Sequence, residues 1–259
     1  MAIRLKNEDD LKLLRESGAI LAEVLDILGR EAVVGMKLSD LDLHARELIA
    51  SRGGEPTFLG YTPEGGRKPY PAAICASVND RVVHGLPTNY ALKPGDVLKI
   101  DAGVTYKRYI TDAAITVQVP PYSHAVSRLL NTTQEALTEA IKACRPGNHL
   151  GDIGHAIEQA AKRGKCAVVS GLTGHGVGFA LHEDPTVYNF GDRKTGMKLT
   201  PGLVLAIEPM FSLGLPDIRQ YDDDSYGTAD GSLTSHFEHT VAITEQGAEL
   251  LTGRKKRVV

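Results

Sequence analysis

Two aspartates, Asp101 and Asp112, stand inside neighbouring apolar runs that are typical of β-strands. If the chain turns at Tyr106-Lys107, directly opposed residues have position numbers that sum to 213, and the two aspartates meet this condition. Opposed side chains in an antiparallel pair lie about 4.5–5.5 Å apart, where two carboxylates repel each other. Asp is also a poor strand residue. Unless one aspartate merely belongs to a turn, the pair predicts a cation between its carboxylates.

Two glutamates occupy similar positions further along the chain. Glu208 lies inside the apolar run 204–211, and Glu238 lies at the mouth of the apolar run 237–243. A buried carboxylate without a partner costs several kcal/mol. Four acidic side chains in four apolar runs are therefore hard to explain as structural residues, and they favour a ligand site.

Two histidines lie in a glycine-rich segment. His175 stands between two glycines, and His182 follows seven residues later. The glycine spacing does not complete a dinucleotide-binding fingerprint, because Phe179 occupies the third glycine position. The pair His182-Glu183 does not begin a His-Glu-x-x-His zinc motif, because Thr186 replaces the second histidine. Each histidine alone is more often structural, so the segment gains weight only beside the acidic residues.

Taken together, these residues predict a dinuclear metal site. Four carboxylates carry a charge of −4, which two divalent cations neutralise in sum. With one imidazole there are five ligands, enough for two metals about 3.5–4 Å apart if carboxylates bridge and water fills open positions. Oxygen-rich ligation with one imidazole favours Mn, Fe, Co or Zn. Glu208 or another nearby acid is a candidate general base for the bridging water. The expected ligands are Asp101, Asp112, His175, Glu208 and Glu238.

The order and contexts of these residues resemble those of type I methionine aminopeptidases, which have the pita-bread fold. The resemblance extends from about Lys6 to Leu251 and is highly specific as a set. It implies an enzyme that hydrolyses the initiator methionine from nascent polypeptides when the second residue is small, with a water activated by two metals attacking the scissile carbonyl. The motifs that carry it are Ile100-Asp101-Ala102-Gly103, Thr111-Asp112, Gly174-His175-Gly176, Ile207-Glu208-Pro209 and Phe237-Glu238-His239-Thr240.

The resemblance assigns a role to each metal ligand. Asp101 would chelate one metal, and Asp112 and Glu238 would bridge both metals. His175 and Glu208 would complete one side of the centre.

The resemblance also implies catalytic roles for two histidines. His182 would meet the substrate carbonyl and its developing oxyanion. His84, in Val82-Val83-His84-Gly85, would lie near the scissile amide nitrogen and assist the leaving amine.

An apolar pocket for the methionine side chain follows from the same resemblance. Phe58 and Leu181 differ in type from the residues of the best-known bacterial members, and the stretch Thr62–Pro69 reads as an insertion beside the pocket. Asn79 matches a family position near a monovalent cation that is held by main-chain carbonyls. The pocket residues expected from the family are Tyr61, Tyr70, Cys75, Phe58 and Leu181.

The elements that must position these residues can be predicted from periodicity and from turn residues. A long loop over Pro56–Pro71, rich in Gly, Pro and Tyr, is typical of a binding element. The expected helices are one that Asn7 caps with apolar positions from Leu11 to Leu28, one from a Ser39 cap to Gly53-Gly54, Ser123–Cys144 and Leu150–Gly164. The expected strands are Ala72–Val78, Asp96–Val104, Ile110–Val119, Leu203–Phe211 and Phe237–Thr244.

This order of helices, strands, helices and strands predicts one α+β domain of two similar halves. In the pita-bread fold, the two halves are pseudo-symmetric and helices cover an antiparallel sheet. We expect residues 1–259 to form a single catalytic domain with a short N-terminal helical segment and without a zinc-finger extension.

Composition narrows the function classes. Of the 259 residues, 42% are apolar and 24% are charged, which is the balance of a globular protein. The net charge of −3 gives no support for a nucleic-acid groove or a basic membrane face. Three cysteines without a Cys-x-x-Cys pair, no apolar run of about 18 residues and no secretory leader favour a cytoplasmic protein with neither DNA nor membrane as partner.

Two alternatives stay open beside this hypothesis. One is a proline-directed aminopeptidase of the same fold, although such relatives usually carry a separate N-terminal domain. The other is a non-catalytic pita-bread protein that binds a partner, although such relatives typically lose metal ligands. The expected partners are nascent polypeptide N-termini at the ribosome, and the expected state is a monomer.

Overall fold

The computed structural model describes residues 3–62 and 68–253. Its four helices are α1 (Glu8–Glu31), α2 (Leu38–Ser51), α3 (His124–Ala143) and α4 (Leu150–Gly164). The strands of the first half are β1 (Glu55–Pro56), β2 (Ile74–Val78), β3 (Arg81–Val83), β4 (Val97–Tyr106) and β5 (Tyr109–Gln118). The remaining strands are β6 (Ala167–Val168), β7 (Gly174–Gly176), β8 (Glu183–Val187), β9 (Val204–Ile207), β10 (Met210–Ser212), β11 (Ile218–Gln220), β12 (Tyr226–Thr228), β13 (Thr234–His236), β14 (His239–Thr244) and β15 (Gly247–Leu250).

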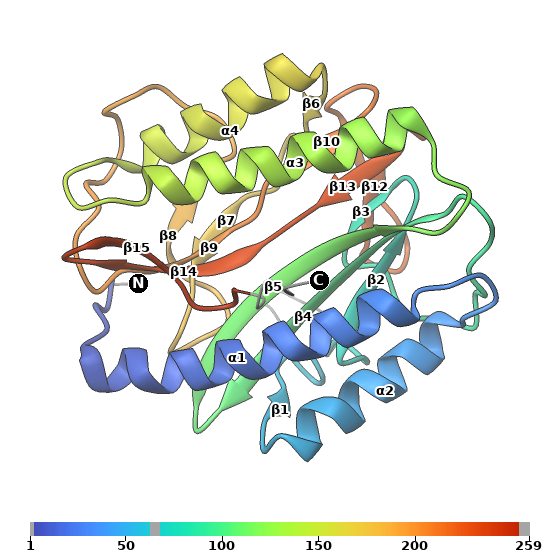
Figure 1. The fold of residues 1–259 in the computed structure, drawn as a ribbon, viewed down its shortest axis with the longest axis horizontal. Coiled ribbons are helices and arrows are strands. Elements are labelled where there is room, and N and C mark those ends of the chain that lie inside the picture. Colours follow the sequence, from blue (N-terminus) through green and yellow to red (C-terminus); the bar gives the residue numbers. More distant parts are fainter. Residues whose placement is uncertain (1–2, 63–67, 254–259) are drawn as a thin grey trace, which may run out of the picture.

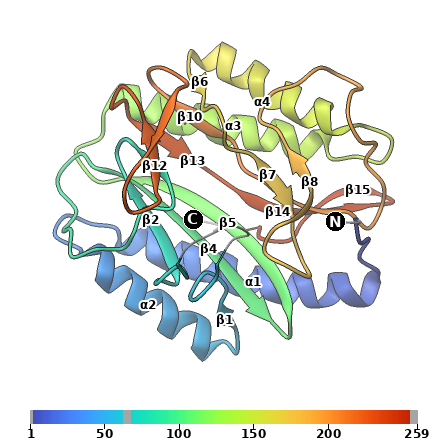
Figure 2. The same cartoon turned by 180° about the vertical axis from the view of Figure 1, so that it is seen from behind.

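The chain forms two halves, each with a pair of helices that covers one side of antiparallel strands. Helices α1 and α2 lie against β4, β5 and β2, whereas α3 and α4 lie over the sheet β15-β14-β9-β7-β8 (Figures 1 and 2). Each half has its own large apolar cluster, one built around α1 and β4 and the other around α3, α4 and β9. The predicted α+β fold of two similar halves is therefore confirmed.

Local signals at the start of α1 act as expected. The Asp10 amide donates to Asn7 Oδ1 at 2.9 Å, and the Asn7 amide donates to Asp10 Oδ2 at 2.8 Å. This reciprocal capping box satisfies two amides that the helix itself leaves free. Leucines at helical spacing, including Leu14, Leu21 and Leu28, then face the sheet without exposure to solvent. Both predicted helices of the second half are confirmed as well, with Ser123 as the cap of α3.

The predicted start of α2 is wrong. The helix begins at Leu38 with Lys37 as its cap, and Ser39 already lies inside the helix. The amide of Leu38 donates to the Tyr90 carbonyl at 3.0 Å, and the amide of Ser39 donates to the Thr88 carbonyl at 2.9 Å. Main-chain carbonyls from a distant loop therefore accept the hydrogen bonds of the first helical amides, which a capping side chain would otherwise accept.

The hairpin register is also corrected. Its two turn residues are Lys107 and Arg108, both with positive φ (47° and 73°), which is the geometry of a two-residue type I′ turn. Asp112 consequently pairs with Gly103 rather than with Asp101. The slip is two residues, and side chains alternate with a period of two, so the two aspartates stay on the same face as diagonal neighbours.

Both predicted strands that carry a glutamate are broken at that glutamate. The run 203–211 divides into β9 and β10 around Glu208-Pro209, and the run 237–244 has no strand until β14 begins at His239, with β13 ending at His236. Strands β9 and β14 belong to the five-stranded sheet, whereas β10 and β13 belong to a separate three-stranded sheet. Each glutamate therefore stands where the chain passes from one sheet to the other.

The two halves meet along β5. The amide of Glu238 donates to the Ala114 carbonyl at 3.0 Å, and the Ala114 amide returns a bond of 3.4 Å. On one side of this pair Thr240 Oγ1 bonds both the amide and the carbonyl of Asp112 at 2.9 and 2.7 Å. On the other side Thr116 Oγ1 bonds the carbonyl and the amide of His236 at 2.6 and 2.9 Å. Threonine hydroxyls thus extend the hydrogen-bonded seam where main-chain pairing stops.

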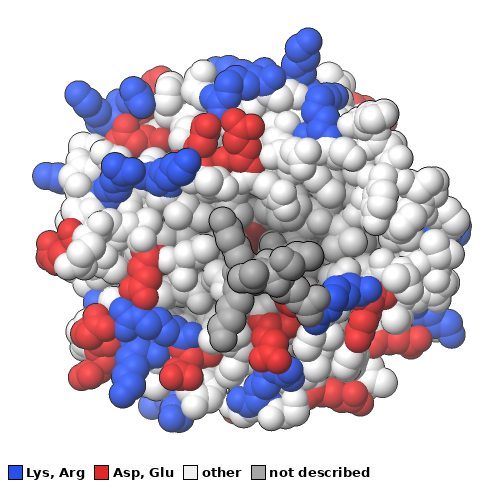
Figure 3. Space-filling view, viewed as in Figure 1, with Lys and Arg blue, Asp and Glu red and all other residues white. Residues whose placement is uncertain are grey.

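Surface properties agree with the balance of the composition. On the face drawn in Figure 3, positive and negative side chains of the described residues are interspersed. Among the described residues, no helix is long and apolar enough to cross a membrane.

Candidate metal centre

Four carboxylates from both halves converge beside the seam. Asp101 on β4 and Asp112 on β5 come from the first half, and their carboxyl groups are close enough for each to shift the pKa of the other. Glu208 follows β9 and Glu238 precedes β14 in the second half. Asp112, Glu208 and Glu238 are 4%, 9% and 2% exposed, so the carboxylates are largely withdrawn from water.

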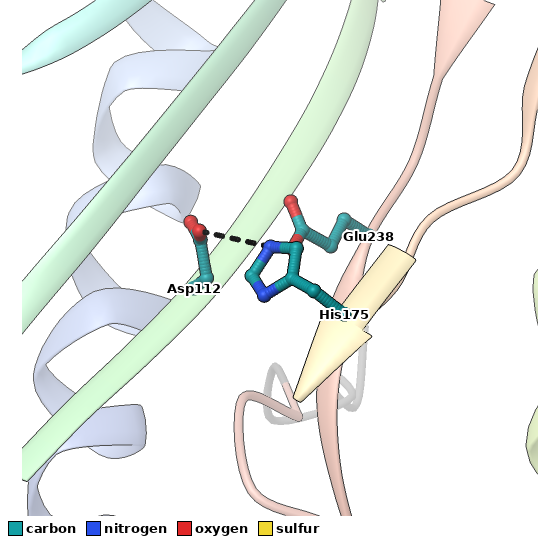
Figure 4. Close-up of side chains that lie close together, drawn as sticks. All are labelled: Asp112, His175 and Glu238. Atoms are coloured by element: carbon teal, nitrogen blue, oxygen red, sulfur yellow. Dashed lines mark ion pairs between the residues drawn. The ribbon is translucent and has the colours of Figure 1, made fainter. Parts of the chain in front are cut away.

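His175 on β7 presents a lone pair to these acids. Its Nδ1 lies 2.8 Å from the Gly176 carbonyl, which can only accept, so Nδ1 carries the proton. The bare Nε2 then lies 4.0 Å from Asp112 Oδ2 (Figure 4). It also lies 3.5 Å from Glu208 Oε1. A Cβ on the flanking Gly174 would lie 2.4 Å from the Ala206 carbonyl oxygen, so the glycine permits this close approach.

His236 is a residue of the site that the sequence analysis did not single out. The last residue of β13, it is 1% exposed, and its Nε2 lies 3.4 Å from Glu208 Oε2 and 3.8 Å from Glu238 Oε2. Neither ring nitrogen has a hydrogen-bond partner in the described structure. Its place two residues before Glu238, directly ahead of the apolar run 237–243, is the signal that could have identified it.

Burial sets the protonation states of the centre in the absence of metal. It raises the pKa of Asp101 to about 7 and raises the pKa values of Asp112, Glu208 and Glu238 well above the ordinary range. For Asp101, Asp112 and Glu238, repulsion from the other carboxylates adds to this effect. Burial also lowers the pKa of His175 to about 3, so this imidazole stays neutral and keeps a lone pair.

The unpartnered atoms of the centre fit a cation. Asp101 Oδ1, Asp112 Oδ1 and Glu238 Oε1 are buried without a hydrogen-bond partner among the described residues. Buried polar atoms are almost always satisfied, and a cation satisfies acceptors that a proton donor does not reach.

The donor set divides into two groups that share one residue. Asp112, His175 and Glu238 form the first group, and Glu208, His236 and Glu238 form the second, with the ligand atoms of each group within 4.8 Å of one another. Oxygen and imidazole donors in this proportion suit Mn, Fe, Co or Zn. A carboxylate common to both groups is what two neighbouring metals need.

A third histidine, His182, lies beside the centre. The ring of His182 packs edge-on against that of His175, with 4.5 Å between centroids. Its Nδ1 lies 2.7 Å from the Tyr61 hydroxyl. The tyrosine therefore fixes the rotation of the His182 ring and leaves Nε2 available.

Glu183 anchors the loop that carries His182. Its Oε1 accepts from the amides of Phe179 and Ala180 at 2.5 and 2.9 Å. Its Oε2 forms an ion pair of 2.5 Å with Lys6, whose ammonium is almost fully buried. Burial lowers the pKa of Lys6, and the pair with Glu183 opposes this effect.

The residues predicted to line a methionine pocket lie together. Buried Phe58, Cys75 and Leu181 form one apolar cluster, against which Tyr61 and Tyr70 pack. The cluster is adjacent to the metal centre, since Cys75 pairs with Asp101 across β2 and β4. That this cluster binds the methionine side chain stays a prediction. Most of the predicted insertion, residues 63–67, lies outside the described residues.

His84 follows β3 and lies at the rim of the site. Its φ of 60° is a left-handed conformation that few residues other than glycine adopt. The exposed ring packs edge-on against Tyr226, with 5.9 Å between centroids. The predicted contact of His84 with a leaving amine stays a prediction.

Comparisons with known proteins agree along the whole chain. The profile of metallopeptidase family M24 matches residues 12–245. A methionine aminopeptidase from Aquifex aeolicus is 42% identical over 97% of this chain and 99% of its own length, and one from Clostridium perfringens is 40% identical over 96% and 98%. The crystal structure of a methionine aminopeptidase from Thermotoga maritima superposes with a TM-score of 0.93, covers 98% of this chain and 100% of its own, and is 38% identical. These three relatives share the fold and more than a third of the sequence.

Proposed function

The chain belongs to metallopeptidase family M24, and from this membership and the geometry of its centre we propose that it is a methionine aminopeptidase with the pita-bread fold. The enzyme removes the N-terminal methionine of polypeptides by hydrolysis. The observation that carries the proposal is the convergence of buried, unpartnered carboxylate oxygens and neutral imidazoles from both halves of the chain, in a chain similar to methionine aminopeptidases over nearly its whole length.

Five residues would hold two divalent metal ions, and Asp112 and Glu238 would be the carboxylates that both ions share, which the place of Glu238 in both donor groups supports. When bound, such ions polarise the scissile carbonyl and make a bound water acidic. Glu208 would act as general base for the attacking water, because burial raises the pKa of its carboxyl group and its two oxygens lie 3.5 Å from His175 Nε2 and 3.4 Å from His236 Nε2. The proposed ions are Mn, Fe, Co or Zn, and a metal titration distinguishes among them. The five residues are Asp101, Asp112, His175, Glu208 and Glu238.

Two histidines would act on the substrate. His182, held through Nδ1 by Tyr61, would donate from Nε2 to the carbonyl oxygen as negative charge develops on it. His84 would protonate the leaving amine from the opposite rim. The cluster of Phe58, Cys75 and Leu181 would receive the methionine side chain, because an unbranched thioether fits an apolar pocket of aromatic and sulfur-containing groups.

The remaining parts of the proposal concern the setting of the reaction. The substrate is a nascent polypeptide with a small second residue, met at the ribosome in the cytoplasm by a monomeric enzyme. An initiator methionine is available first on a chain that is still being synthesised, which supports this location.

A peptide panel tests the proposal. Protein stripped by a chelator is supplied separately with Mn, Co, Fe or Zn and offered Met-Ala-Ser, Met-Lys-Ser, Leu-Ala-Ser and Ala-Pro-Ser. We expect metal-dependent release of methionine from Met-Ala-Ser and little cleavage of the other peptides. Preference for Ala-Pro-Ser would move the protein to the proline-directed enzymes, and no cleavage with any metal would leave a binding protein.

A further inference from the structure

Lys99 is among the largest fully buried side chains of the molecule. It lies in β4, two residues before Asp101, and is 1% exposed. Its Nζ donates to the main-chain carbonyl of Asn79 at 2.7 Å and to that of Val97 at 3.4 Å. A buried amino group is normally matched by a carboxylate in direct contact. In the described structure this one is instead held by peptide oxygens.

The oxygen site around this amino group is built by three strands. Asn79 adopts a left-handed conformation (φ 58°), and its side chain bonds the Val97 amide and the Asp96 carboxylate, each at 2.9 Å. Thr234, at the start of β13, contacts the same Asn79 carbonyl at 3.0 Å and the Arg81 carbonyl at 3.1 Å. The Asn79 carbonyl that holds the Lys99 amino group is therefore fixed from β4, through the bond between the Asn79 side chain and Val97, and from β13, through Thr234.

Carbonyl and hydroxyl oxygens are the donors that hold Na⁺ and K⁺ in proteins. Burial lowers the pKa of Lys99 to about 7, and the negative potential of the Asp80 and Asp96 carboxylates opposes this effect. We propose that the Lys99 amino group is a tethered occupant of a monovalent-cation site, and that the protein consequently needs no free Na⁺ or K⁺ there. The Lys99 amino group would thus take the place of the monovalent cation that the family resemblance implies near Asn79.

The position of Lys99 connects this occupant to the metal centre. Thr234 opens β13, which ends at His236, and Glu238 follows two residues later. Lys99 holds the Asn79 carbonyl, to which Thr234 is also bonded. It therefore helps to fix the position of β13 and of Glu238, which follows β13, relative to the centre. It is a positioning residue, because in the described structure its amino group bonds main-chain carbonyls and acts on the centre through β13 and through its own strand β4, which carries Asp101. The inference rests on these contacts and does not depend on the proposed peptidase function.

Thermal unfolding of the manganese-loaded protein tests the inference without any substrate. Wild type is compared with Lys99→Ala in NaCl, KCl and choline chloride at equal ionic strength. We expect the same Tm for wild type in all three salts. Lys99→Ala, which leaves the oxygens and removes the amine, should melt about 2–4 °C higher in NaCl or KCl than in choline chloride if about 100 mM salt fills a site with a Kd of about 10 mM. Lys12→Ala, which removes an exposed lysine of α1, should behave as wild type.

Either of two results would overturn the inference. One is a Tm of wild type that rises specifically in NaCl or KCl, which would mean that a free cation already binds. The other is a folded Lys99→Ala variant that does not distinguish Na⁺ or K⁺ from choline. If Lys99→Ala does not fold, the wild-type comparison and Lys99→Met, which fills the space with an apolar chain and should show no cation response, keep the test decisive. Failure of the peptide panel would leave these outcomes unchanged.

Discussion

At the scale of single residues, the metal centre is a set of charges that the fold brings together and does not neutralise by itself. Among the described residues, several of its buried oxygens have no hydrogen-bond partner, and His175 offers it a lone pair rather than a proton. The acids were identifiable from sequence because carboxylates in apolar runs violate an energetic rule. His236 and Lys99 were not, because one histidine or lysine near a strand end is ordinary when its burial is unknown.

Replacing a ligand that both metal groups share should abolish turnover. We expect Glu238→Gln, which keeps the shape and loses the charge, to lower kcat/KM by at least about 10³-fold and to lose bound metal. Metal content by elemental analysis and methionine release measure the two effects. Wild-type rates in this variant would refute the ligand assignment.

His84→Ala should separate catalysis from metal binding. Removal of a general acid typically lowers kcat by about 10²–10⁴-fold, and we expect metal content to stay at the wild-type level. Loss of metal from this variant would show that the histidine is a ligand and not a proton donor.

Tyr61→Phe tests the orientation of His182. The variant loses one hydrogen bond to Nδ1, worth about 1 kcal/mol, so kcat should fall roughly fivefold. Tyr188→Phe, at a tyrosine that is 53% exposed, is the matched control and should leave kcat unchanged. An unchanged kcat in Tyr61→Phe would mean that the ring of His182 is held by its packing on His175 alone.

At the scale of elements, local signals predicted helices well and strand geometry less well. Capping and leucine spacing are encoded within one turn, so α1, α3 and α4 follow from sequence. The hairpin register depends on positive φ at Lys107 and Arg108, and neither residue is a typical choice there. The cap of α2 and the breaks at the two glutamates arise from contacts with distant parts of the chain, which no local pattern contains.

The loop that presents His182 should depend on Glu183 more than on Lys6. In Lys6→Met the glutamate still accepts from the amides of Phe179 and Ala180, whereas Glu183→Gln loses the charge on which all three contacts depend. We expect Glu183→Gln to lower the free energy of unfolding by roughly 1.5–3 kcal/mol and to reduce kcat/KM more than Lys6→Met does. Urea unfolding and methionine release compare the two variants. Equal losses of activity would contradict this order.

At the scale of the whole molecule, metal and pH should act together on stability. Acid groups with raised pKa values stabilise the metal-free fold while protonated, and this contribution is lost as pH rises through the folded pKa, which for Asp101 is about 7. His175 has a lowered pKa and weakens the fold only below its ordinary value of 6.5. From pH 6.5 upward the buried lysines act in the opposite direction, since burial lowers the pKa of Lys99 to about 7 and lowers that of Lys6, but the four acids outnumber them.

The metal-free protein should therefore melt at a lower temperature at pH 8.5 than at pH 6.5, and added manganese should remove most of this difference. Differential scanning calorimetry at the two pH values, with and without metal, measures it. A metal-free Tm that rises over this interval would show that the four carboxylates are not buried together.

Hydrogen bonds of the Thr240 hydroxyl join the two halves of the molecule. Thr240→Val should lower the free energy of unfolding by about 2–5 kcal/mol, because it leaves the amide and the carbonyl of Asp112 without their partner. Thr240→Ser keeps the hydroxyl and should lose much less. Urea unfolding of both variants measures the difference, and similar losses would show that the methyl group, not the hydrogen bonds, carries the effect.

The position of the centre on this seam has a further consequence. Asp101 and Asp112 belong to one half, whereas His175, Glu208 and Glu238 belong to the other. An ion bound by both sets is a removable crosslink between two modules of one chain. Chelation would then weaken the joint as well as the chemistry, so the enzyme would become easier to digest at the connection between its halves under the conditions that switch it off.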